Sequence, residues 1–289
     1  MSAAVARTNL LTMTSSKMTK ASQTQPILIV AHPGHELVIL GWIEELRPVV
    51  NILSDGSGRS GASRLPSSLR VLRDAAAEPG PILAAFSDRE CYDGVLDGHV
   101  EMFVDLAIRL ADEFVERRPP YVVGDAREGI NPVHDICRAI IDAAVARAAR
   151  HGVTIPNLEF SLFAPHARRA REARERGIYR ILGQSEHRRK IETARAYAEL
   201  ASEVEWALSG SSRKLMERYP ELAAILDEVI AGMNENSFAT ECLLPVSPAA
   251  DGRAFYELYG ERLVADGTYA RAIRYSDHVR PIERALASI

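Results

Sequence analysis

The sequence has few of the features that mark secreted, membrane-spanning or nucleic-acid-binding proteins. Its three cysteines, Cys91, Cys137 and Cys242, are far apart and odd in number, which argues against a disulfide framework and fits a reducing cytoplasm. No apolar run approaches the roughly 20 residues of a membrane span. The net charge of −4 gives no general attraction to nucleic acid or to anionic membranes. We therefore expect a cytoplasmic protein without a membrane span or a nucleic-acid partner.

The first 25 residues differ in composition from the remainder of the chain. Residues 1–25 are rich in Ser, Thr, Ala and Lys and have no continuous apolar core, so we predict a disordered tail. A targeting peptide is the alternative, although the apolar stretch Leu10–Met13 is short for one. We expect residues 26–289 to form a single α/β domain with a C-terminal elaboration from about residue 165. A boundary near Pro156 or Pro165 is equally compatible with the pattern.

Short apolar segments alternate with helical patterns along the chain. Strands are predicted over 26–31, 49–53, 82–86, 121–123, 158–163 and 238–246. Helices are predicted over 37–46, 65–77, 100–116, 134–150, 213–233 and 253–265, a helical pattern over 168–208, and a polar loop over 87–98. This alternation predicts a Rossmann-like, mostly parallel sheet with helices on both faces, extended by C-terminal helices and a late strand.

The first predicted strand runs directly into His32-Pro33-Gly34-His35-Glu36. In open α/β sheets, ligands bind at the carboxyl ends of the strands. Two imidazoles three residues apart on a tight turn can point at one ion, and neutral imidazole is a good ligand for zinc and other divalent metals. We therefore predict that His32 and His35 bind a metal, with a polar capping turn as the alternative.

Two further loops place polar residues after predicted strands. Asp55 follows the strand over 49–53, and Asn131, His134 and Asp135 follow the strand over 121–123. If these strands are parallel, all three loops lie at one edge of the sheet, which makes His134 the natural third ligand. Three protein ligands plus an open position are typical of a catalytic zinc site, where the ion acidifies bound water and polarises a carbonyl.

Together these motifs resemble those of the LmbE-like, or PIG-L, zinc-dependent N-deacetylases. AHPGHE at 31–36 is similar to the family's AHPDDE, SDGSG at 54–58 to its TDG, and NPVHD at 131–135 to its HPDH. Lys190 and the segment Ala194–Tyr197 resemble the family's Lys…Ala…Tyr helix. The resemblance spans roughly Pro26–Ala201. It implies a zinc hydrolase that cleaves non-peptide C–N bonds in substrates containing N-acetylglucosamine.

The chain departs from the family at the residues of acid–base chemistry. Gly34 stands where the family has an aspartate thought to be the general base, and His35 where it has a metal-binding aspartate. Asn131 replaces the first His of HPDH, thought to help the tetrahedral intermediate or the leaving amine, and Val133 replaces its Asp. The resemblance therefore implies an altered metal set of His32, His35 and His134, without the family's acid–base apparatus.

Other residues at the same edge could take over the missing roles. Glu36, Asp55 or Asp135 could act as the base, and Asn131 could donate a hydrogen bond to an oxyanion. Three neutral ligands leave the double positive charge of the ion intact, which favours anionic substrates. Such a set suits zinc, and also iron, nickel or copper.

The sequence leads to three hypotheses. The first is a zinc-dependent, deacetylase- or amidase-like hydrolase acting on an amide of a sugar or small polar metabolite, for example an amino sugar or an anionic metabolite. The second is a non-hydrolytic relative that uses the pocket for binding or other metal chemistry, because Gly34 replaces the base. The third is a nucleotide-sugar-binding protein without a metal. A homo-oligomer, the metal's identity and the role of the Arg-rich segment 166–180 are left open.

Overall fold

A computed structural model describes residues 25–289, except for 59, 164–165, 210–218, 220–221, 223–224, 226–232 and 248–252. The tail predicted at 1–25 therefore lies outside the described residues apart from Gln25. The helix predicted over 213–233 also lies outside them, apart from residues 219, 222, 225 and 233. Within the described ranges, none of the helices combines the length and the apolar character needed to cross a bilayer.

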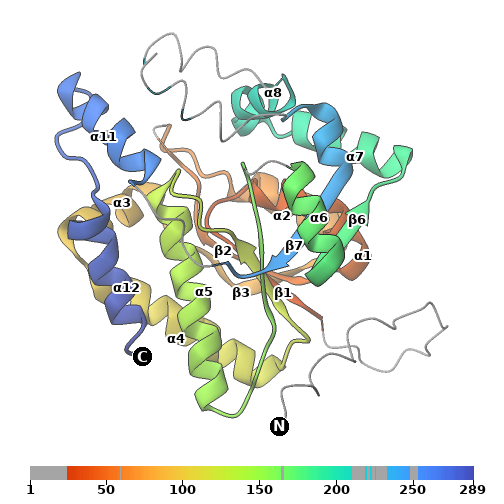
Figure 1. Ribbon diagram of the computed structural model, residues 1–289, viewed down its shortest axis with the longest axis horizontal. Helices are drawn as coiled ribbons and strands as arrows, with labels where there is room; N and C mark the ends of the chain where they lie inside the picture. The colour runs from red at the N-terminus through yellow and green to blue at the C-terminus, as the bar shows by residue number, and fades with distance from the viewer. Residues whose placement is uncertain are drawn as a thin grey trace.

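In the described part of the chain, seven strands form one sheet, in the order β3-β2-β1-β4-β5-β7-β6 (Figure 1). They are β1 (Ile27–Val30), β2 (Val49–Ser54), β3 (Glu78–Phe86), β4 (Val122–Asp125), β5 (Asn157–Phe160), β6 (Ile178–Ile181) and β7 (Thr240–Pro245). Strands β1 to β5 pair in parallel, and β7 is antiparallel to both β5 and β6. The predicted mostly parallel α/β fold is confirmed.

Helices cover both faces of this sheet. The α-helices are α1 (Leu40–Leu46), α2 (Leu65–Asp74), α3 (Asp88–Asp97), α4 (Val100–Arg117), α5 (Pro132–Arg150), α6 (His166–Arg176), α7 (Gln184–Arg195), α8 (Ala201–Ser209), α11 (Phe255–Ala265) and α12 (Arg280–Leu286). Short helical turns are η1 (His35–Ile39), η2 (Ala198–Leu200), η3 (Glu235–Ala239) and η4 (Tyr275–Val279).

Two apolar cores form because side chains alternate along the central strand. Ile27 and Ile29 of β1 point to the core shared with α4, α5 and α12, whereas Leu28 and Val30 point to the core shared with α1 and α2. All four side chains are fully buried, as expected for a central strand that is covered on both faces. The carboxyl end of β1 is thereby fixed in the middle of the molecule.

Two segments differ from their prediction. The polar loop predicted over 87–98 is mostly helix α3, which begins with a capping box: the Ser87 hydroxyl accepts from the Glu90 N–H, and the Glu90 carboxylate accepts from the Ser87 N–H. The helical pattern predicted over 168–208 is interrupted by β6, which pairs with β7. That pairing joins residues about 60 positions apart, so local periodicity gives no sign of it.

A buried ion pair ties the C-terminal elements to α1. The Glu241 carboxylate of β7 accepts from the N–H groups of Gly41 at 2.8 Å and Trp42 at 2.7 Å. The Lys190 ammonium of α7 donates to Glu241 at 2.9 Å and to the Val38 carbonyl. Both charged side chains are almost fully buried. Glu241 thus satisfies backbone donors at the start of α1, where negative charge is favourable.

Removing the cation from this pair should destabilise the fold. We predict that Lys190→Met lowers the free energy of unfolding by about 3–5 kcal/mol, because it leaves the Glu241 charge buried without its partner. The measurement is urea unfolding followed by circular dichroism. The control is Arg189→Met in the neighbouring, half-exposed pair with Glu44, which should change the same quantity by no more than about 1 kcal/mol. Equal effects of the two substitutions would contradict the assignment.

Candidate metal centre and adjoining cavity

The candidate site lies at the centre of the sheet, where its strand order reverses. Strand β1 pairs with β2 on one side and with β4 on the other, so successive strands diverge from the line between β1 and β4. Such a switch point is where open α/β sheets bind ligands. His32 and His35 follow the carboxyl end of β1, and His134 lies in the first turn of α5, after β4. Distant parts of the chain therefore meet at this edge.

The three imidazole rings predicted to share an ion lie against one another. Their centroids are 5.4 Å apart for His32–His35, 5.1 Å for His32–His134 and 4.5 Å for His35–His134. Three imidazoles bound to one tetrahedral zinc at about 2.0–2.1 Å would have centroids about 5 Å apart. The spacing of the rings therefore matches that of a three-histidine site.

The relative orientation of the three rings differs from pair to pair only slightly. The ring pairs meet edge to face, with interplanar angles of 62–82°. Across the described residues, no three His, Cys, Asp or Glu side chains are already arranged as a formed metal site. The structure thus gathers the imidazoles without converging their donor atoms.

Some buried atoms of this cluster and of the adjoining Asp125 have no hydrogen-bond partner among the described residues. Nε2 of His32, Nδ1 of His134 and Oδ1 of Asp125 have none within the described structure. An unsatisfied buried polar atom costs about 1–3 kcal/mol, so such atoms are uncommon and need an explanation. Two imidazole nitrogens and a carboxylate oxygen are donor atoms that a divalent cation satisfies. The residues present therefore fit a bound metal ion.

Two carboxylates hold two of the three rings. His32 Nδ1 lies 3.0 Å from Asp88 Oδ1 and 2.7 Å from Ser54 Oγ. His35 Nδ1 lies 2.9 Å from Asp125 Oδ2, which also accepts from the Ala31 N–H at 2.8 Å. A carboxylate on Nδ1 favours the tautomer whose Nε2 lone pair is free, as is usual for metal-binding histidines.

The same contacts set the charge of the cluster. Burial, together with the neighbouring His35 and His32, holds the pKa of His134 well below its ordinary value, so this ring is neutral at pH 7. Burial alone would lower the pKa of His35, but Asp125, Glu36 and Glu128 outweigh it and the pKa is raised. Burial alone would raise the pKa of Asp88, but its hydrogen bonds with His32 and Ser54 hold it well below the usual range.

Two of the residues predicted to assist catalysis organise the loops after β1 and β2. Glu36 is fully buried, and its carboxylate accepts from the Gly34 N–H at 2.7 Å and from the Ser68 hydroxyl. Burial raises the pKa of Glu36 despite these bonds. Asp55 accepts through Oδ1 from the N–H groups of Ser57 and Asp88, both at 2.9 Å. Its Oδ2 takes no hydrogen bond within the described structure.

The other two residues predicted to assist catalysis, Asp135 and Asn131, organise the start of α5. Asp135 Oδ1 accepts from the N–H groups of Glu128 and Gly129, both at 3.1 Å, and burial raises its pKa to about 6. Asn131 is the N-cap of the helix: its Oδ1 accepts from the Val133 N–H at 2.8 Å, and its Nδ2 donates to the Tyr92 hydroxyl at 2.9 Å. Both residues thus hold the turn that presents His134.

The sequence analysis missed the two anchoring carboxylates. Asp125 is the last residue of β4, and Asp88 is the first residue of α3 in the segment predicted as a loop. A signal was present for both, since each is an acidic residue at the carboxyl end of a predicted strand, where ligand-binding groups gather. Their pairing with particular histidines could not be deduced, because it depends on strand order.

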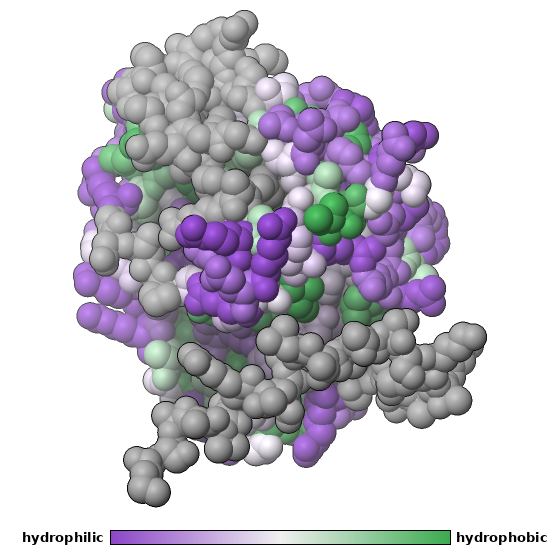
Figure 2. Space-filling model, turned by 45° about the vertical axis from the view of Figure 1, so that its right-hand side comes forward, coloured by the Kyte–Doolittle hydropathy of each residue, from purple (hydrophilic) through white to green (hydrophobic). Residues whose placement is uncertain are grey.

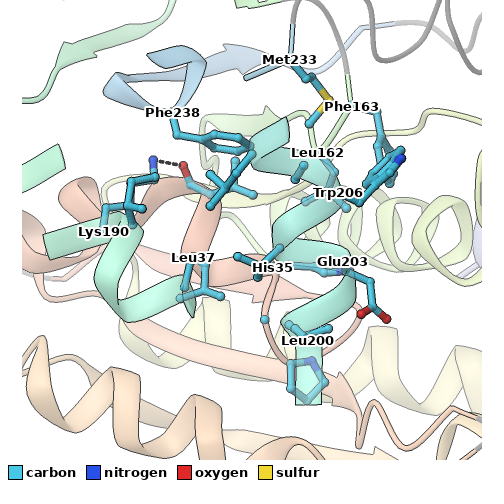
Figure 3. A pocket seen from close by; sticks show the side chains of 18 of the residues that line it. His35, Leu37, Leu162, Phe163, Lys190, Leu200, Glu203, Trp206, Met233 and Phe238 are labelled. Carbon is cyan, nitrogen blue, oxygen red and sulfur yellow. Dashed lines mark hydrogen bonds between the residues drawn. The ribbon is translucent and has the colours of Figure 1, made fainter. Parts of the chain in front are cut away.

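An apolar cavity of about 250 Å³ adjoins the histidine cluster (Figure 3). His35 and His134 form part of its wall, and α7, η2 and α8 supply much of the remainder. Figure 3 shows the Phe163, Trp206 and Phe238 side chains around this space, with the Glu203 carboxylate directed away from it. On the face in Figure 2, polar residues dominate and apolar ones form small separate groups.

Leu200 occupies the space beside Gly34 in this wall. A Cβ atom at Gly34 would collide with Leu200 Cδ1, and the Gly34 φ of +105° is one that other residues rarely adopt. An aspartate here, where the resembling family has one, would therefore require Leu200 to move and would strain the backbone.

Comparisons with known proteins give similarity at the level of the fold. No protein-family model and no curated protein matches the chain. The A40926 pseudoaglycone deacetylase Dbv21 is similar in structure, with 16% identity and a TM-score of 0.42 over 80% of this chain and 100% of that one. The zinc-inhibited form of teicoplanin deacetylase Orf2 gives 15% and 0.43 over 79% and 100%. The conserved protein TT1542 from Thermus thermophilus gives 15% and 0.45 over 80% and 98%.

Two of these three proteins are deacetylases by name.

The fit between Gly34 and Leu200 gives a stability prediction. Gly34→Ala should lower the free energy of unfolding by about 2–4 kcal/mol, from backbone strain and overpacking together. Gly98→Ala is the matched control, because Gly98 also has a positive φ but open space around it; it should cost about 1 kcal/mol. Adding Leu200→Ala to Gly34→Ala should cost less than the sum of the single changes. Strict additivity in urea unfolding would show that the two positions do not compete for space.

Proposed function

We propose that this chain is a metal-dependent hydrolase of the N-deacetylase type, acting on an amide of a sugar or of a small polar metabolite. The observation that carries the proposal is the meeting of three imidazoles at the β1–β4 switch point, with centroids 4.5–5.4 Å apart. Two of the rings are held by carboxylates, and two have a buried nitrogen without a partner in the described structure. A purely structural histidine cluster has no need of unsatisfied nitrogens.

In this proposal, His32, His35 and His134 hold one divalent ion. Zinc suits three neutral imidazoles, and iron, nickel or copper are further candidates. When bound, such an ion acidifies water and polarises the carbonyl of the amide. The low pKa of His134 keeps its ring uncharged and able to bind.

The residues around the histidines supply orientation. Asp125 joins His35 to the Ala31 backbone of the β1 end, and Asp88 joins His32 to Ser54 at the end of β2. Each carboxylate therefore links an imidazole to a rigid strand. Ligands held on strand ends keep their geometry better than ligands on free loops do.

Hydrolysis adds a water oxygen to the acyl carbon, breaks the C–N bond and delivers a proton to the departing nitrogen. The proton-transfer groups that we propose are Asp55 and Asp135, because each keeps one carboxylate oxygen without a hydrogen bond in the described structure. Glu36 is the weaker candidate, since both its oxygens are engaged. Asn131 can still offer its second Nδ2 hydrogen to an oxyanion.

The second candidate function is metal binding or metal chemistry without hydrolysis. The filling of the Gly34 position by Leu200 favours it, since the base of the resembling family is both missing and sterically replaced. Assays of amide hydrolysis on metal-loaded protein separate the two candidates. Metal bound at one equivalent with no release of amine from a panel of N-acyl amino sugars would favour the second.

The proposed ligands can be tested by metal content and turnover together. Purified protein should contain about one divalent ion per chain, and EDTA treatment should abolish amide hydrolysis until zinc is restored. His32→Ala and His134→Ala should each reduce bound metal at least tenfold and reduce kcat/KM by at least a hundredfold. If both variants keep the metal content and turnover of the unmodified chain, the proposed site is wrong.

The anchoring carboxylates give a subtler prediction. Asp125→Asn should weaken zinc binding about 10- to 100-fold, because the His35 ring loses the charged acceptor that orients it. Competition with a fluorescent zinc chelator measures the affinity. Asp105→Asn makes the same chemical change at an exposed position on α4 and should leave the affinity unchanged. Equal affinities for the two variants would rule out an orienting role for Asp125.

A further inference from the structure

The cavity beside the histidines is larger than an acetyl group requires. We propose that the amide substrate carries a medium-length aliphatic acyl chain, which this cavity receives; the inference rests on the proposed function. The volume is about 250 Å³, whereas one water molecule, similar in size to a methylene group, takes about 30 Å³ of liquid. The space therefore suits roughly eight non-hydrogen atoms. An acetyl methyl group would leave most of it empty.

The wall of the cavity suits hydrocarbon. Most of the residues that line it are apolar, among them Leu37, Leu162, Phe163, Trp206, Met233 and Phe238. Phe163 and Trp206 meet edge to face with centroids 6.0 Å apart. Burying methylene groups against such a wall makes the free energy of binding more favourable. Burying hydroxyl groups there without hydrogen-bond partners makes it less favourable.

The charged residues of the wall are already engaged. Lys190 donates to Glu241 and to the Val38 carbonyl. The dashed line at Lys190 in Figure 3 marks the bond to Val38. Arg64 and Glu203 lie 3.7 Å apart as an ion pair, in which Glu203 is more than half exposed. The hydroxyl groups of a sugar would therefore find few free partners in the described wall. The polar part of the substrate belongs outside, which leaves the acyl part for the cavity.

The position of the cavity agrees with this orientation. His35 and His134 belong to the wall, so a carbonyl held at the histidines has its first acyl carbon next to the cavity. Gly34 and Leu200 also line the space on that side. Leu200 thus adds apolar surface at the position where the resembling family has a carboxylate.

Binding can be measured without turnover. The chain has two tryptophans: Trp206 lines the cavity, whereas Trp42 is buried on α1 and donates to the Tyr121 hydroxyl. EDTA-treated protein is titrated with N-octanoylglucosamine and N-acetylglucosamine while tryptophan fluorescence is recorded. We expect the octanoyl compound to bind about a hundredfold more tightly, since each buried methylene contributes up to about fourfold. Trp206→Phe should abolish the fluorescence change.

A variant that fills the cavity supplies the matched comparison. Ala207 lies in the wall and Ala201 is exposed on the same helix, α8. Ala207→Phe should weaken N-octanoylglucosamine binding at least tenfold, and Ala201→Phe should not change it. Equal affinities of the two variants, or of the two ligands for the unmodified protein, would overturn the inference. The comparison of ligands needs no variant, so it holds even if Ala207→Phe fails to fold.

Two further outcomes separate this inference from the proposed function. If the octanoyl compound binds preferentially but metal-loaded protein releases no glucosamine from either amide, the hydrolase proposal fails and the chain-binding cavity stands. If both amides are hydrolysed with equal kcat/KM and equal affinity, the hydrolase stands and the cavity assignment fails. Octyl N-acetylglucosaminide, with its chain on the sugar side, should bind at least tenfold more weakly than N-octanoylglucosamine. Equal binding would overturn the assignment of the cavity to the acyl group.

Discussion

The pairing of carboxylates with imidazoles at the ends of neighbouring strands is the interaction on which the site depends. Asp125 ends β4 and holds His35, which follows β1, while Asp88 holds His32 from the start of α3. These contacts cross between strands and helices that only the folded sheet brings together. They bury charge, and Nε2 of His32 and Nδ1 of His134 have no hydrogen-bond partner in the described structure, a cost that a bound cation would offset.

Residues from both halves of the chain hold the turn that carries His32 and His35 in place. Residues of β1 are buried in two cores, so the carboxyl end of the strand has little freedom. From the C-terminal half, Lys190 and Glu241 fix the start of α1 just beyond the histidine turn. The elements that carry Lys190 also line the apolar cavity. Helix α7 therefore contributes both to the buried ion pair and to the wall of the cavity, as is common for pockets between packed elements.

Much of the fold and part of the site could be predicted from the sequence. β1, with its run of β-branched and leucine residues ending at His32, is encoded locally, as are α4 and α5 through their helical periodicity. A parallel sheet then places His134 at the same edge as His32, and the pairing of β1 with β4 brings the two together. By contrast, β6 becomes a strand through pairing with the distant β7, and α3 depends on its Ser87–Glu90 capping box, which lies in a segment of polar composition.

The partners of the histidines could not be predicted, because Asp88 and Asp125 reach them only through strand order and helix placement. The same holds for Leu200, whose side chain fills the space beside Gly34 from a position far along the chain. The sequence has Gly34 where the resembling family has an aspartate, but it gives no sign that Leu200 lies beside this glycine.

The central claim is that His32, His35 and His134 hold one ion together. Crystals grown with zinc and measured on either side of the zinc absorption edge test this directly, because anomalous scattering locates the ion independently of any assumed ligand. We predict one strong anomalous peak within about 2.0–2.2 Å of a nitrogen of each of the three rings. An empty space among the three rings, with zinc bound elsewhere or not at all, would contradict it.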